Sequence, residues 1–144
     1  MDLPDVNVLV AAHRADLPAH AACLAWLDSV TSGTERFGIS EMVLSSFVRL
    51  VTNQRVFRTP TPINEALAFA NAVRANSNSA RIAPGPSHWE IFERLCREIN
   101  ATGNDVPDAY LAALAMEHGC VWVTTDKGFA RFRGLSLKYP VPPT

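Results

Sequence analysis

The sequence has 144 residues, of which 48% are hydrophobic and 19% charged, and its formal net charge is −1. This composition excludes a disordered chain, and the near-neutral charge excludes a general nucleic-acid coat protein, which would be basic. We expect one domain over residues 1–144 that is large enough to bury a core. We find neither a signal peptide nor an apolar run of roughly 20 residues, and therefore expect a cytoplasmic protein.

Apolar periodicity and turn residues predict strands and helices that alternate along most of the chain. We predict strands at 2–6, 37–39, 80–83, 120–124 and 135–138. We predict helices at 19–32, 41–53 and 62–73, one after a capping box at 87–90, and one from near Pro107 to His118. The alternation predicts an α/β fold, a three-layer α/β/α sandwich with a mainly parallel sheet.

Three aspartates stand where such a sheet would place a site, since ligands bind at the carboxyl ends of parallel strands. Asp5 ends the first predicted strand, and Asp126 follows the strand at 120–124. Asp108 lies in the first turn of the helix that leads into that strand. Each also has a structural explanation, because aspartate is common in turns and favourable at a helix N-terminus.

The combination of the three aspartates favours a metal site. Carboxylates that converge at one sheet edge repel one another, which raises their pKa values unless a cation is present. Mg²⁺ binds one or two protein carboxylates and keeps waters for substrate phosphates. Asp5, Asp108 and Asp126 therefore predict a metal-dependent phosphodiesterase that hydrolyses its substrate with an activated water.

Two blocks of sequence, together with a third segment, resemble a known family. The opening Asp5-Val-Asn7-Val8-Leu9 and the segment from Val106 to Phe132, which includes Pro107-Asp108 and Val123-Thr-Thr-Asp126, resemble PIN-domain nucleases. Within that family the chain is most similar to VapC-type toxins of bacterial toxin–antitoxin systems, and the stretch from Val48 to Phe57 resembles one subgroup of them. The resemblance covers Asp5 to about Pro140.

This resemblance implies an RNA endonuclease with an α/β/α fold and a Mg²⁺ or Mn²⁺ site. It implies cleavage of tRNA or rRNA that inhibits translation, a homodimer, and a cognate antitoxin protein that blocks the site. Carried over to this sequence, Asp5 and Asp108 match the principal metal ligands, and Asp126 matches the acid that completes or supports the site.

One position departs from the family pattern. Many relatives carry a glutamate in the helix after the second strand, where this chain has Ser46. Glu41 lies five residues earlier, about 140° away around the helix, so the two do not share a face. Because Glu41 directly follows the second predicted strand and its cap Ser40, we predict that it supplies the fourth catalytic acid. A helix-terminal acid without catalytic duty is the alternative, in which case Ser46 contributes through a water.

Several other polar residues lie near the predicted site. Asn7 is a candidate to orient Asp5 or a metal-bound water, with a turn role as the alternative. Thr124 and Thr125 are candidates to hold a phosphate oxygen or to fix Asp126, with ordinary strand-end threonines as the alternative. Asp105 is expected to be a helix N-cap, with an outer metal ligand as the alternative. Basic residues are candidate phosphate contacts, and Lys127 is the foremost because it adjoins Asp126. They are Arg49, Arg55, Arg58, Lys127, Arg131, Arg133 and Lys138.

The histidines and cysteines lack the spacing of a metal site. We predict surface or cap positions for His13, His20, His88 and His118. We predict buried reduced thiols for Cys23, Cys96 and Cys120.

Two other classes of function remain as alternatives. A catalytically weak PIN-like module would bind RNA or a protein without cutting. A dehalogenase-type phosphoryl-transfer enzyme would need an aspartate in place of Asn7, and a receiver domain would need acidic neighbours beside the first strand and a lysine at a late strand end.

Overall fold

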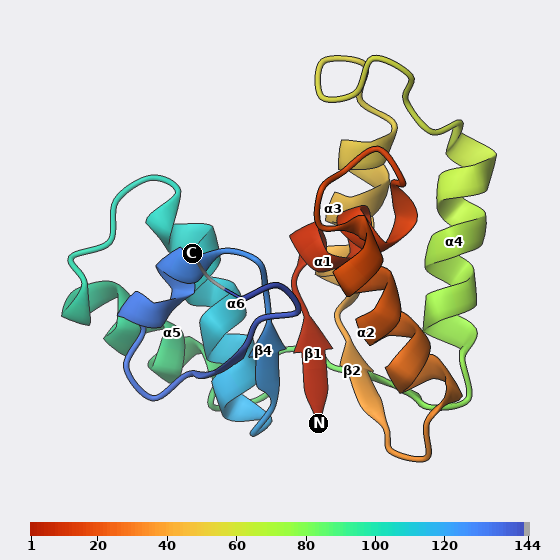
Figure 1. The fold of residues 1–144 in the computed structure, drawn as a ribbon. Coiled ribbons are helices and arrows are strands. Elements are labelled where there is room, and N and C mark those ends of the chain that lie inside the picture. The colour runs from red at the N-terminus through yellow and green to blue at the C-terminus, as the bar shows by residue number, and fades with distance from the viewer. Residues whose placement is uncertain (143–144) are drawn as a thin grey trace.

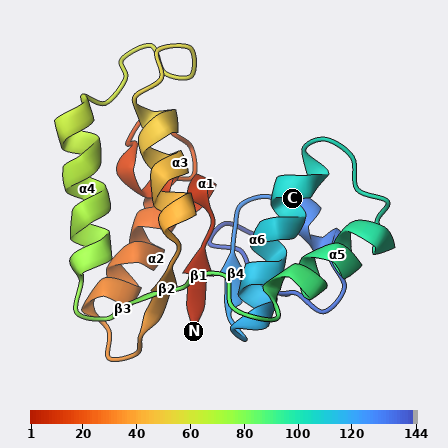
Figure 2. The same ribbon diagram turned by 180° about the vertical axis from the view of Figure 1, so that it is seen from behind.

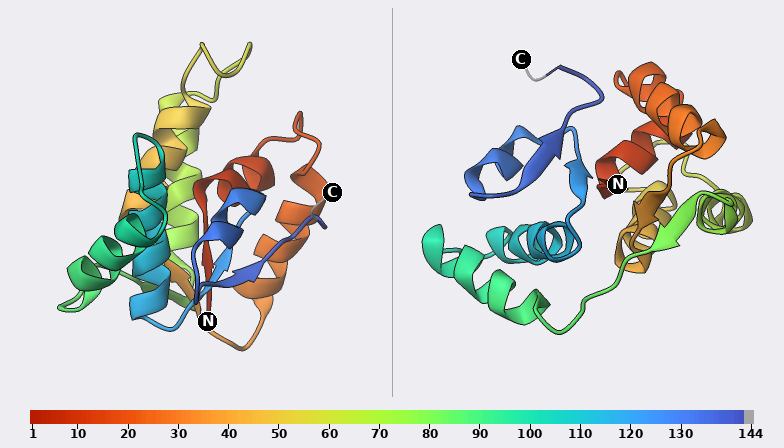
Figure 3. Two further views of the ribbon diagram at one scale, coloured as in Figure 1. Left: turned by 90° about the vertical axis from the view of Figure 1, so that its left-hand side faces the viewer. Right: turned by 90° about the horizontal axis from the view of Figure 1, so that it is seen from below.

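The computed structural model describes residues 1–142, so the last two residues of the expected domain lie outside it. Its strands are β1 (Asp2–Pro4), β2 (Phe37–Ile39), β3 (Ser79–Arg81), β4 (Val121–Val123) and β5 (Ser136–Lys138). Each pairing is parallel: β4 lies between β1 and β5, and β2 pairs with β3. Because β1 also lies against β2, the strands run side by side in the order β3-β2-β1-β4-β5 (Figure 3).

Helices cover both faces of these strands. They are α1 (Val6–His13), α2 (His20–Ser32), α3 (Glu41–Val51), α4 (Ile63–Ala75), α5 (His88–Glu98), α6 (Asp105–Glu117) and the short 3₁₀ helix η1 (Lys127–Arg131). α1 and α2 pack together on one face, and α3 to α6 lie on the other (left panel of Figure 3). The predicted three-layer sandwich is therefore confirmed. No helix of the described residues is both long and apolar enough to cross a membrane.

β2 and β4 are apolar and largely buried because both of their faces are covered, whereas β3 and β5 are more polar and more exposed. Leu3 in β1 and Trp122 in β4 are fully buried side by side in the register of the two strands. The strands point the same way, so β1 leads from the N-terminus into α1, and the carboxyl ends of β1 and β4 lie at the same edge (Figure 1). The residues that follow these two strands are thereby brought together.

The helix α1 is absent from the predicted elements. Residues Val8 to Ala12 are all buried, so this helix lacks the polar face that gives an amphipathic pattern. It contacts both α2 and α3, which explains why it is covered nearly all round. A continuous apolar run of this length is as typical of a buried strand as of a buried helix.

The capping box at the start of α5 is not formed, although the helix begins at His88 as predicted. Ser87 has helical backbone angles and makes no side-chain cap. Its backbone N–H donates instead to the carboxylate of Glu117, at 2.9 Å, and Gly85 N–H donates to the same carboxylate at 2.8 Å. The segment before α5 is thus tied to the end of α6, on which α5 packs (Figure 2). The N-cap predicted at Ser40 is confirmed by its hydrogen bond from Val43 N–H.

Candidate active site

The site begins with the pairing of β1 and β4. Pro4 lies opposite Val123, and the Asp5 N–H donates to the Val123 carbonyl at 2.8 Å. This register places Asp5 beside Thr124 at the carboxyl edge of the sheet. Both residues are buried, so their polar side chains must find partners within the protein.

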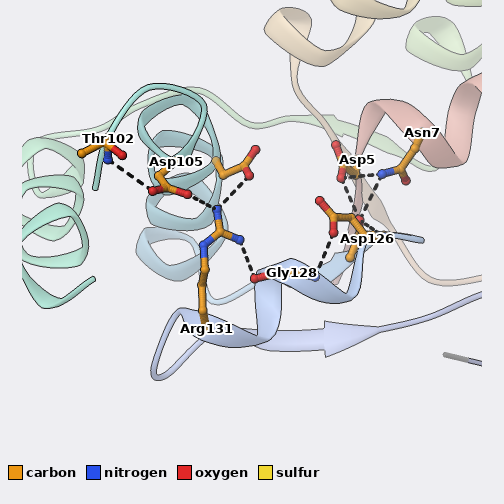
Figure 4. Close-up of polar contacts among 9 residues, drawn as sticks. Asp5, Asn7, Thr102, Asp105, Asp126, Gly128 and Arg131 are labelled. Atoms are coloured by element: carbon orange, nitrogen blue, oxygen red, sulfur yellow. Dashed lines mark hydrogen bonds and ion pairs between the residues drawn. The ribbon is translucent and has the colours of Figure 1, made fainter. Parts of the chain in front are cut away.

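The carboxylate of Asp5 is held by three donors. One oxygen accepts from the Asn7 amide at 3.0 Å (Figure 4) and from the Thr124 hydroxyl at 2.7 Å. The other oxygen accepts from Val6 N–H at 2.7 Å. The side chain of Asp5 is only 3% exposed, and this burial raises its pKa from 3.8 to about 6. The hydrogen bonds from Thr124 and Val6 oppose that rise, while the nearby charge of Asp108 adds to it.

The same network fixes the turn that carries Asp126. The Thr124 hydroxyl oxygen accepts from Asp126 N–H at 3.0 Å, and the Asn7 side-chain oxygen accepts from Thr125 N–H at 3.1 Å. Asp126 itself is exposed, and its carboxylate accepts from Gly128 N–H at 2.8 Å, which caps η1. Asp126 thus has the turn position that was the structural alternative for it, while Asn7 hydrogen-bonds to Asp5 and Thr124 to the backbone of Asp126.

Asp108 comes from the opposite side of the site, in the first turn of α6. Its carboxylate accepts from the Arg131 guanidinium at 3.0 Å. The same guanidinium nitrogen donates to Asp105 at 3.2 Å, so one arginine bridges two aspartates (Figure 4). Asp105 is not the N-cap that the sequence suggested: Asn104 holds that place, and Asp105 accepts from Thr102 N–H ahead of the helix.

These side chains have the chemistry of a magnesium site, but they do not converge on one point. Among residues 1–142, no three histidine, cysteine, aspartate or glutamate side chains lie close enough together to enclose a metal ion. Asp108 is turned toward Arg131. Mg²⁺ nevertheless needs only one or two carboxylates, because waters and phosphate oxygens complete its shell. The buried Asp5 and the adjacent charge of Asp108 fit that requirement.

Comparison with known proteins identifies the fold family. The family model of the PIN domain matches residues 3–135. The chain belongs to the PIN-domain family. This confirms the resemblance seen in the opening block and in the segment from Val106 to Phe132.

Curated relatives of this PIN domain include VapC proteins. It is 44% identical over 137 residues to VapC ribonuclease Mb2897 of Mycobacterium bovis, which covers 95% of this chain and 93% of that protein. It is 43% identical over 143 residues, 99% of each chain, to ribonuclease VapC25 of Mycobacterium tuberculosis.

Solved structures share the same fold at low sequence identity. VapBC2 from Rickettsia felis, bound to a DNA fragment from its promoter, matches with a TM-score of 0.69 and 16% identity over 95% of this chain and 96% of that chain. DNA-bound VapBC from Salmonella typhimurium matches with a TM-score of 0.67 and 17% identity over 96% and 97% of the two chains.

Glu41 of this PIN domain does not join the aspartates. It begins α3 as expected, but its carboxylate pairs with Arg74 at 2.7 Å and with Arg81 at 3.8 Å. The hydrogen bond from Arg74 lowers the pKa of Glu41, as an ion pair at an exposed surface does. This placement does not support the predicted role of Glu41 as the fourth catalytic acid. It agrees with the alternative, in which Glu41 is an acid at the helix N-terminus without catalytic duty. Ser46 is half-buried in the same helix.

The histidines are more structural than the sequence suggested. The prediction of surface or cap positions is wrong for His88, which is buried and hydrogen-bonds to the Tyr110 carbonyl. His13 makes edge contacts with the rings of Phe47 and Phe69, which stack on each other. The three cysteines are free thiols as predicted, although Cys96 is only half-buried.

The role of Arg131 is what sequence reasoning missed. The sequence suggests Arg131 as a phosphate contact, whereas in the structure it forms ion pairs with Asp105 and Asp108. Nothing in the local sequence signals this pairing, because Arg131 is 23 residues from Asp108 and meets it only after β4 folds back along α6.

Proposed function

We propose that this PIN domain is a metal-dependent endoribonuclease and the toxin of a VapBC-type toxin–antitoxin pair. The observation that carries the proposal is the buried carboxylate of Asp5, which Thr124 and Asn7 hold at the carboxyl edge of the sheet. The names of the relatives, which are VapC ribonucleases at 43–44% identity over nearly the whole chain, support RNA as the substrate.

The cofactor we propose is Mg²⁺, with Mn²⁺ as a substitute, held by Asp5, Asp108 and Asp126. A bound divalent ion supplies Lewis-acid chemistry at the phosphodiester. The chain contributes the rest. Thr124 and Asn7 fix the orientation of Asp5, so its oxygens are in place before a ligand arrives. Asp126, exposed beside this network, is placed to hold a water or substrate group at the mouth of the site.

The partners we propose are RNA and an antitoxin protein. The VapBC structures from Rickettsia felis and Salmonella typhimurium support an antitoxin partner, since their folds match this one over nearly its full length. Cleavage of tRNA or rRNA would then inhibit translation in the cytoplasm, and the active form would be a homodimer.

The test is RNA cleavage by the purified protein. We expect cleavage of structured RNA with Mg²⁺ or Mn²⁺, loss of cleavage with EDTA, and recovery on addition of metal. Asp5→Asn should reduce the rate by at least about 10²-fold, because it removes the ligand carboxylate. Asp28→Asn, an exposed acid on α2, is the matched control and should cleave at the wild-type rate. Cleavage that persists in EDTA or in Asp5→Asn would contradict the proposal.

A second candidate is a PIN-like module that binds RNA or a protein without cutting. It is favoured by Ser46, which stands where many relatives have a glutamate, and by the engagement of Glu41 with Arg74. It predicts protection of one RNA segment in footprinting, with the strand intact after long incubation with metal.

A further inference from the structure

Arg131 is anchored in place at the edge of the proposed metal site. Its guanidinium carbon lies 4.5 Å from the centre of the Phe132 ring, and one terminal nitrogen donates to the Gly128 carbonyl. The other terminal nitrogen donates to Asp108 at 3.0 Å and to Asp105 at 3.2 Å. The positive guanidinium group therefore contacts Asp108, one of the proposed metal ligands.

The remaining nitrogen of this side chain is left without a partner. Within residues 1–142, the Arg131 Nε and the Trp122 Nε1 are the two buried side-chain nitrogen or oxygen atoms that make no hydrogen bond. An unpaired buried donor on a charged group is unfavourable. The side chain therefore holds this position through Phe132, the Gly128 carbonyl and the two carboxylates, although its own hydrogen-bonding capacity is incompletely met there.

A cation bound at Asp5 and Asp108 would need the same Asp108 carboxylate that Arg131 holds. The guanidinium of an arginine stays charged in proteins, so Arg131 cannot relieve this conflict by becoming neutral. It must turn away from Asp108 or repel the incoming ion. Asp105 offers a place for it, since the same nitrogen already donates to Asp105.

We propose that Arg131 is a positioning residue that competes with the divalent cation for Asp108, and that Asp105 retains its guanidinium when the cation binds. Arg131 thereby lowers the metal affinity of the RNA-free protein and keeps Asp108 neutralised when no metal is present. This inference rests on the proposed function, because it assumes the metal site at Asp5 and Asp108.

The experiment is a titration of the RNA-free protein with Mn²⁺. Binding is measured by calorimetry and by the electron paramagnetic resonance signal of the free ion. Arg131→Gln should bind Mn²⁺ more tightly than wild type, by roughly three- to tenfold, because a competing unit charge is removed. Arg97→Gln is the matched control: it breaks the exposed Arg97–Glu93 ion pair on α5 with the same change in net charge. Its Kd should equal that of wild type.

A double-mutant cycle tests the role of Asp105. In wild type, Asp105→Asn should weaken Mn²⁺ binding, because Arg131 then has only Asp108 to hold. In the Arg131→Gln background the same change should have a clearly smaller effect. Equal effects in both backgrounds would contradict a retaining role for Asp105.

Folding is checked by thermal unfolding of each variant. Should Arg131→Gln fail to fold, Arg131→Lys keeps the charge and the alkyl stem but loses the planar fork, and a smaller tightening is expected. Unchanged or weaker Mn²⁺ binding by the folded variant overturns the inference, because Arg131 would then have no effect on the metal affinity or would increase it.

The two proposals fail in different ways. Asp5→Asn should abolish Mn²⁺ binding if the metal site is where we propose. If Asp5→Asn binds Mn²⁺ like wild type, or if wild type binds none, both proposals are wrong. If Asp5→Asn loses binding while Arg131→Gln leaves it unchanged, only the inference on Arg131 is wrong.

Discussion

Asp5 combines burial with charge, and these oppose each other. The side chain is almost completely covered, yet the proposed chemistry needs its ionised form. Thr124, Asn7 and Val6 reduce the cost of ionisation without removing it, since the pKa remains raised at about 6. The metal-free protein therefore holds a destabilising charge at neutral pH, which a bound cation would compensate.

This leads to a pH-dependent stability difference between wild type and Asp5→Asn. Because the pKa of Asp5 is raised in the folded state, its carboxyl does not destabilise the folded protein below about pH 4. Stability of the folded protein is lost as the pH rises toward 6, where this carboxyl ionises less readily than in the unfolded chain. A rise of about two pKa units corresponds to about 3 kcal/mol. Between pH 4 and pH 7, the free energy of unfolding of wild type should therefore fall by about that amount relative to Asp5→Asn, measured by urea denaturation in EDTA. Parallel pH profiles for the two proteins would show that the carboxyl is not destabilised by burial.

Residue chemistry also explains what could be predicted of the site. Asp5, Asp108 and Asp126 were predicted from their places after strands or at a helix start; the structure links Asp5 to the Asp126 turn through Thr124, whereas Asp108 is paired with Arg131. Glu41 satisfied the same rule, but Arg74 and Arg81 draw it into a surface ion pair. Those arginines are more than 30 residues away along the chain, so the competition for Glu41 is a tertiary effect that the local pattern does not contain.

At the scale of elements, the strand positions and most helices follow from the sequence because their apolar patterns agree with their environments. The helix α1 does not, because burial on nearly all sides removes its amphipathic period. The start of α5 shows a subtler difference. The Ser87–Glu90 pattern predicts the right boundary, yet Glu117 from α6 supplies the acceptor that the box would have provided.

Substitutions at these two residues should separate the two capping modes. Ser87→Ala should change the free energy of unfolding by no more than about 0.5 kcal/mol, because the serine side chain caps nothing. Glu117→Ala should cost about 1–3 kcal/mol, because it leaves the N–H groups of Gly85 and Ser87 without their charged acceptor. Urea denaturation gives both values. A larger effect at Ser87 than at Glu117 would restore the capping box.

At the scale of the whole molecule, β4 carries the largest of the fully buried side chains. It lies between β1 and β5, and its Trp122 is fully buried against Phe129. Yet the indole N–H of Trp122 has no hydrogen-bond partner. The largest fully buried side chain thus carries an unsatisfied donor.

Two substitutions distinguish these contributions. Trp122→Ala should destabilise the protein by about 3–5 kcal/mol, through lost burial and the cavity that remains. Trp122→Phe should cost clearly less, about 1 kcal/mol, because it keeps an aromatic ring and removes the unpaired donor. Thermal and urea unfolding check both. Equal losses would mean that the indole N–H has a partner in solution.

The pairing of Asp5 with Thr124 also has a consequence for biosynthesis. The two residues are 119 positions apart, so a nascent chain displays Asp5 long before Thr124 leaves the ribosome. Until β4 emerges, β1 has no partner strand on that side and Asp5 has neither Thr124 nor the Asp126 turn beside it. Chains interrupted before that point contain the first aspartate but no assembled site. For a protein proposed to act against translation, activity would thus begin only after β4 has been synthesised.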